Sequence, residues 1–109
     1  MLESKAVIGE SDMLQTMQLD ALKYAGKALD EFEASDSTEI ARFIKKEFDK
    51  VYGPGWQCVV GTSFGSFVTH HCGCFIHFGI GNLAILLFRG GATPQADTGR
   101  FVTMEAAKA

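Results

Sequence analysis

Histidine and cysteine side chains, which bind metals and take part in thiol chemistry, crowd into one short segment of this chain. Residues 70–77 read His-His-Cys-Gly-Cys-Phe-Ile-His. Zinc prefers nitrogen and sulfur ligands of these types, and a thiol beside an imidazole is the pairing found in cysteine nucleophiles. The segment between His70 and His77 is therefore a candidate metal- or thiol-based site.

The spacing of these residues does not favour that chemistry. Structural zinc sites need four convergent ligands, usually supplied as two separate pairs, whereas all of these side chains lie on one predicted hairpin that turns at Gly73. Because side chains alternate between the faces of a strand, His70 and His71 would point in opposite directions. No orienting acid is recognisable beside Cys72. We therefore predict no metal ligands, no catalytic residues, no cofactor and no enzymatic activity, with the metal or thiol site as the alternative.

The composition indicates one small, slightly acidic globular domain. The chain has 109 residues, of which 47% are hydrophobic, and a formal net charge of −3. Nucleic-acid-binding domains usually carry a basic patch, so no nucleic-acid partner is predicted. The N-terminus lacks a secretory pattern, and the longest apolar run, residues 82–88, is too short to cross a bilayer. We expect a cytoplasmic protein with reduced cysteines and no membrane partner.

Two helices are predicted in the first half of the chain. A short β-branched run at residues 5–8 precedes a stretch of helical periodicity over residues 11–33, with Asp12 as the predicted N-cap. A second helix follows the polar residues 34–39 and ends at Gly-Pro-Gly 53–55. Its apolar face is predicted to consist of Ile40, Ile44, Phe48 and Val51.

Strands are predicted in the second half, where the hydrophobic period changes from 3.6 to 2. The four segments are residues 56–61, 63–71, 74–79 and 82–88, separated by short glycine-containing turns. Short turns predict an antiparallel meander, and helices followed by strands indicate an α+β fold with two helices packed on the sheet. Residues 63–71 mix aromatic and hydroxyl side chains on both faces, which suits either a sheet edge that meets another chain or an ordinary interior strand.

The residues after the last strand differ in composition from the rest. They are small, polar and contain Gly and Pro as far as Gly99, which predicts a flexible extension over residues 92–109 and a folded domain over residues 1–91. The final stretch, residues 100–109, has the composition of either a short helix or a strand.

Five segments, taken in order, resemble the small dimeric dynein light chains. They are residues 5–8, 15–22, 44–56, 58–70 and 83–91, with the shorter match Asp-Met at residues 12–13 between the first two, and the similarity extends over residues 5–91. The resemblance implies the order strand, helix, helix and four strands. It also implies a strand-swapped homodimer in which the segment matching residues 64–70 joins the partner's sheet.

The same resemblance implies a non-catalytic, cytoskeleton-associated hub. In this family, two grooves at the dimer interface each accept an extended peptide as an additional strand, typically with a Thr-Gln-Thr-like motif. The implied partners are the dynein intermediate chain and disordered segments of other proteins. By position, the implied peptide-binding residues are Ser37, Thr38, Glu39, Phe64, Gly65, Ser66, Phe67, Val68, Thr69, His70, Phe75 and His77. The implied dimer-interface residues are Gln57, Phe64, Ser66 and Val68.

Overall fold

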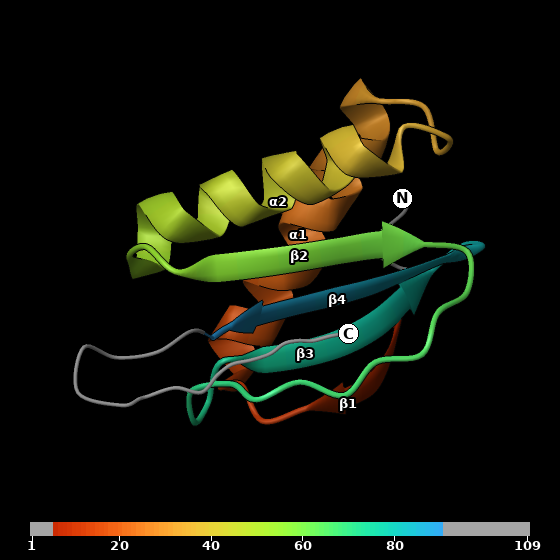
Figure 1. Cartoon of the computed structure of the whole chain (residues 1–109). Helices are drawn as coiled ribbons and strands as arrows, with labels where there is room; N and C mark the ends of the chain where they lie inside the picture. Colours follow the sequence, from red (N-terminus) through yellow and green to blue (C-terminus); the bar gives the residue numbers. More distant parts are fainter. Residues whose placement is uncertain (1–5, 91–109) are drawn as a thin grey trace.

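The computed structural model describes residues 6–90, which form two helices packed on one face of an antiparallel sheet (Figure 1). The elements in chain order are β1 (Ala6–Ser11), α1 (Gln15–Glu31), α2 (Ser37–Tyr52), β2 (Trp56–Gly61), β3 (Phe75–Ile80) and β4 (Leu83–Arg89). The sheet has the order β1-β3-β4-β2. The predicted α+β fold is confirmed, and residues 92–109 of the predicted extension lie outside the described residues.

The apolar face predicted for the second helix is buried in α2, with one exception. Ile40, Ile44 and Phe48 of α2 are all 0% exposed, but Val51 is 51% exposed. In that last turn Tyr52 takes the inward position, with its ring centroid 5.0 Å from that of Phe48. The buried face of α1 consists of small residues, Ala21, Ala25, Gly26 and Ala28, which let the two helices approach closely.

Asp12 does not cap α1, contrary to the prediction. The helix begins at Gln15, and its N-cap residue Leu14 makes no side-chain cap hydrogen bond. The Asp12 carboxylate instead accepts the backbone N–H of Gly73 at 2.9 Å, 61 residues further along the chain. A carboxylate is a strong acceptor for any nearby backbone donor, so a long-range contact replaced the local one.

Aromatic rings close the core where α2 meets the sheet. The rings of Phe48 and Trp56 meet edge to face at 4.8 Å, and both side chains are fully buried. The backbone N–H of Trp56 donates to the Asp49 carboxylate at 3.0 Å. This bond holds the start of β2 against the end of α2, so the Gly-Pro-Gly turn returns the chain directly along the helix.

A hydrogen bond from Tyr52 connects the two helices, and it predicts that the stability of the fold depends on pH. Its hydroxyl donates to Asp20 of α1 at 2.5 Å, and burial followed by this bond raises the pKa of Tyr52 to about 12. Because the folded state disfavours the phenolate, the contribution of Tyr52 is complete below pH ~10 and is lost as the pH rises towards 12.

We expect Tyr52→Phe to lower the free energy of unfolding by about 1 kcal/mol at pH 8, since one partly buried hydrogen bond is lost. The difference between the two proteins should shrink between pH 10 and pH 12, measured by urea unfolding. A difference that stays constant over this range would contradict the assigned role of the hydroxyl.

One predicted strand is missing from the sheet. Residues 62–71, here called the arm, form no strand within the described chain, and β4 lies between β2 and β3. The predicted meander is therefore wrong for this part of the chain. The arm runs along β3 (Figure 1), but both edges of β3 are already paired, with β1 and with β4. No free edge is thus available where the arm passes.

Candidate functional site

The backbone of the arm lacks partners along most of its length. Within the described chain, residues 62–70 take part in no backbone–backbone hydrogen bond, and the first such bond joins the His71 N–H to the Arg89 carbonyl at 2.8 Å. Extended backbone with unpaired N–H and C=O groups is a template for pairing with another strand. The arm therefore has backbone groups available for hydrogen bonding to another strand.

Two side chains of the arm rest on the sheet face opposite the helices. The Phe64 ring lies 5.7 Å from His77, and His70 stacks on Phe75 at 4.6 Å with an interplanar angle of 22°. The structure thus brings together four of the residues implied for peptide binding. The arm's remaining side chains are outside this cluster: Val68 is half-buried, Gly65, Ser66 and Thr69 are exposed, and Phe67 is 101% exposed.

A second candidate region lies between the edge strand β2 and the start of α2. This strand pairs with β4 on one side and is the last strand of the sheet on the other. Beside it, a depression of about 250 Å³ opens against the start of α2. Its lining comprises Ser37, Thr38, Ala41, Cys58, Val59 and Val60.

Ser37 and Thr38 are among the residues that the resemblance implied for peptide binding, whereas Ala41, Cys58, Val59 and Val60 are not. Finding these four residues requires knowing that β2 is an edge strand, which depends on the non-local pairing of β4. Gln57, implied at the dimer interface, is exposed on the same strand. The structure does not bring Ser37 and Thr38 together with the arm of their own chain, because the arm lies on β3.

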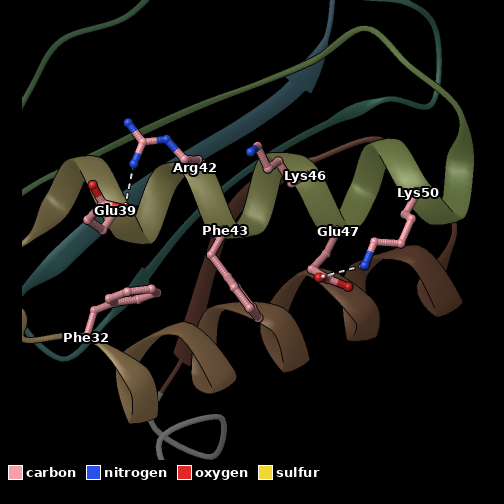
Figure 2. A pocket seen from close by; sticks show the side chains of 7 residues that line it. All are labelled: Phe32, Glu39, Arg42, Phe43, Lys46, Glu47 and Lys50. Carbon is pink, nitrogen blue, oxygen red and sulfur yellow. Dashed lines mark hydrogen bonds and ion pairs between the residues drawn. The ribbon is translucent and has the colours of Figure 1, made fainter.

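Glu39 lies apart from this depression. It lines a different one of about 260 Å³ between α1 and α2, where Phe32 and Phe43 also lie (Figure 2). Its carboxylate pairs with Arg42 at 2.5 Å, and Glu47 pairs with Lys50 at 3.3 Å. Solvent screens the attraction within such exposed pairs, so they contribute little to stability. This surface has the character of the solvated face of α2.

The segment rich in histidine and cysteine forms the turn into β3. Gly73 has φ +78°, and the Cys74 N–H donates to the His71 carbonyl at 3.0 Å, so the predicted turn at Gly73 is confirmed. Among residues 6–90, no three His, Cys, Asp or Glu side chains converge in a way that could hold a metal ion. The Nδ1 atom of His70 lies 2.9 Å from the His71 carbonyl, to which it donates.

The environment of two thiols opposes nucleophilic chemistry. Burial raises the pKa of Cys58 and, more moderately, that of Cys74. A raised pKa lowers the fraction of thiolate, which is the reactive form. At Cys74 the positive charge of Arg89 acts in the opposite direction, but burial is the larger effect and the pKa stays raised.

Comparison with known proteins agrees with the architecture. A family model described as dynein light chain type 1 matches residues 5–90. No helix among the described residues is long and apolar enough to cross a membrane.

Among solved structures, the chain resembles the dynein light chain-like domain of a calcium binding protein of Fasciola hepatica, FhCaBP2. Over 81% of this chain and 94% of that one, the identity is 22% and the TM-score 0.69. A second structure of that domain gives 21% identity over 79% and 91% of the two chains, with a TM-score of 0.67. The dynein light chain-like domain of CsTAL3 gives 16% identity over 78% and 92%, with a TM-score of 0.65. The fold is shared with these domains, and on its match to the family model the chain belongs to the dynein light chain type 1 family.

Proposed function

We propose that this chain is a non-catalytic peptide-binding adaptor that acts as a strand-swapped homodimer. Membership of the dynein light chain family supports an adaptor role. The observation that carries the proposal is that, within residues 6–90, both the arm and the outer edge of β2 lack a backbone partner. If the arm of each copy pairs along β2 of the other, both edges are satisfied by one symmetric interface.

The docked arm would leave its outer edge free for a ligand. An extended peptide can add there as a further strand, beside the first turn of α2, where Ser37 and Thr38 lie. The free amides of a helix N-terminus suit a polar acceptor such as the side chain of Gln. Thr69 and Phe75 are the proposed pocket for a central Thr, which matches a Thr-Gln-Thr-like motif.

The expected binding free energies favour a dimer with two grooves. A net contribution of about 0.5–1.5 kcal/mol from each backbone hydrogen bond, together with one good pocket, gives about micromolar affinity for a short strand. Two grooves that engage two copies of one partner gain an avidity of about 10²–10⁴. We propose the dynein intermediate chain and disordered segments of other proteins as partners, in the cytoplasm and on the microtubule cytoskeleton.

We expect Thr69→Ala to weaken peptide binding about five- to thirtyfold, since a hydroxyl contact contributes about 1–2 kcal/mol. Thr69 is exposed in the single chain, so the fold should be unchanged, and the dimer should persist because the substitution keeps the backbone groups through which the arm would pair. Calorimetry with a Thr-Gln-Thr peptide and light scattering measure the two properties separately. Thr62→Ala, also on the exposed arm but outside the proposed groove, is the matched control. Equal losses in both variants would show that Thr69 has no specific role.

The proposed function is tested by the same two measurements on the unaltered chain. We expect a particle of twice the 11.8 kDa chain mass that binds one peptide per chain. Zinc analysis of chelator-free protein covers the alternative site in residues 70–77. A protein with one zinc per chain and no peptide binding would refute the adaptor and restore the metal site.

A further inference from the structure

We propose that this chain carries a segment that competes with external peptides for the groove. Residues 100–104 would bind the peptide groove as an added strand. The inference rests on the groove proposed above and concerns the regulation of that same site. The occupant is a segment of this chain outside the described residues. Three observations support it: the point where the chain leaves the sheet, the length of the intervening segment and the sequence of the segment itself.

The chain leaves the sheet close to the groove. Arg89, the last residue of β4, pairs with Trp56, the first residue of β2. The Arg89 side chain donates to the Pro54 carbonyl at 2.9 Å, which holds this end of β4 beside the start of the edge strand. Strands are spaced about 4.8 Å apart. With the partner's arm paired on β2, the bound peptide would be the third strand out from β4. Its position, here called the peptide lane, therefore lies about 14 Å from β4.

The segment between the sheet and the proposed ligand has a suitable length. Residues 91–99 read Gly-Ala-Thr-Pro-Gln-Ala-Asp-Thr-Gly. A random coil of nine residues has a root-mean-square span of about 15–18 Å, which matches the distance from β4 to the strand position proposed for the peptide. Tethering is most effective when the span and the linker length agree, so residue 100 reaches the lane without stretching the linker.

Residues 100–104 have the composition of a strand. They read Arg-Phe-Val-Thr-Met, with one aromatic and two β-branched residues, types that are enriched in strands. Alternation would place Phe101 and Thr103 on one side and Val102 on the other. The receiving surface offers apolar contacts, since Val59 is 43% exposed and lines the depression with Ala41. Thr103 also provides a threonine for the pocket that is proposed to bind the central Thr of a peptide ligand.

Because residues 100–104 belong to the same chain as the groove, they would compete effectively with an external peptide even if they bind weakly. A short flexible linker gives an effective concentration of about 1 mM. A segment with an intrinsic dissociation constant of about 0.1–0.5 mM would then raise the apparent dissociation constant of an external peptide about three- to tenfold. The groove would thereby favour strong or bivalent partners over weak single motifs.

The test compares three full-length chains: unaltered, Phe101→Ser with Val102→Ser, and the control Ala106→Ser with Ala107→Ser. We expect the first double variant to bind a Thr-Gln-Thr peptide three- to tenfold more tightly than the other two chains, measured by calorimetry. In the unaltered chain, nuclear Overhauser contacts from Val102 to Thr38 should be present and should vanish when the peptide is in excess.

The outcomes separate this inference from the proposed function. Equal affinity in all three chains, or contacts from Val102 to the free edge of β1 instead, would overturn the internal ligand and leave the groove intact. Failure of every chain to bind the peptide would overturn both proposals.

Discussion

Proline at the adjacent arm positions 66 and 67 is expected to separate dimerisation from peptide binding. In a strand, successive backbone N–H groups point to opposite edges. One of these two donors would therefore face β2 of the partner, and the other would face the bound peptide. Proline removes the donor at its position and leaves the opposing carbonyl unpaired.

We expect one proline variant to be a monomer without peptide binding. The other should remain a dimer that binds peptide about thirtyfold more weakly, because a lost hydrogen bond and an unpaired carbonyl together cost about 2 kcal/mol. Ser66 and Phe67 are exposed, and their segment makes no backbone hydrogen bond within the described chain. The fold of the single chain should therefore be unaffected in both variants, as measured by circular dichroism.

Ser66→Ala and Phe67→Ala are the controls, since both keep the backbone donor. Light scattering reports the oligomeric state and calorimetry the peptide affinity. If Ser66→Pro and Phe67→Pro both remained dimers with unchanged affinity, the arm would not be the strand that pairs. If both lost only the dimer, the peptide would bind elsewhere.

Phe48→Ala is expected to cause the largest loss of stability. The Phe48 side chain is 0% exposed, and its ring contacts three others, with centroids at 4.8 Å to Trp56, 5.0 Å to Tyr52 and 6.0 Å to Tyr24. Truncation removes apolar burial and leaves a cavity that the edge-to-face neighbours cannot fill. A buried Phe→Ala substitution costs about 3–5 kcal/mol, which is much of the ~5–15 kcal/mol that stabilises a typical domain.

Val51→Ala is the matched control for Phe48→Ala, because it shortens an apolar side chain on the same helix that is 51% exposed. We expect it to change the free energy of unfolding by about 0.5 kcal/mol or less. Urea unfolding at one fixed protein concentration measures both variants, since dimerisation links stability to concentration. Similar losses in the two variants would show that the aromatic cluster is not the centre of the core.

The sequence alone determined most of the local structure. Ile40, Ile44 and Phe48 recur at the helical period, and the structure buries all three against the sheet. Residues 75–80 alternate, with Ile76, Phe78 and Ile80 buried on the helix side. These features depend on spacing within one element, which a single chain shows directly. The strand predicted over residues 63–71 did not form, and the structure leaves the backbone of residues 63–70 without a backbone partner among the described residues.

Only the tertiary structure decided how these elements are ordered in space. Strand pairing is non-local, so nothing in the spacing of the strands places β4 between β2 and β3 or makes β2 an edge. That order sets Val59 and Cys58 beside Ser37 and Thr38, and it leaves Glu39 on the other side of α2. The candidate groove thus arises from hydrogen-bonding edges that the sheet leaves unpaired, a property of the assembled sheet and of no single segment.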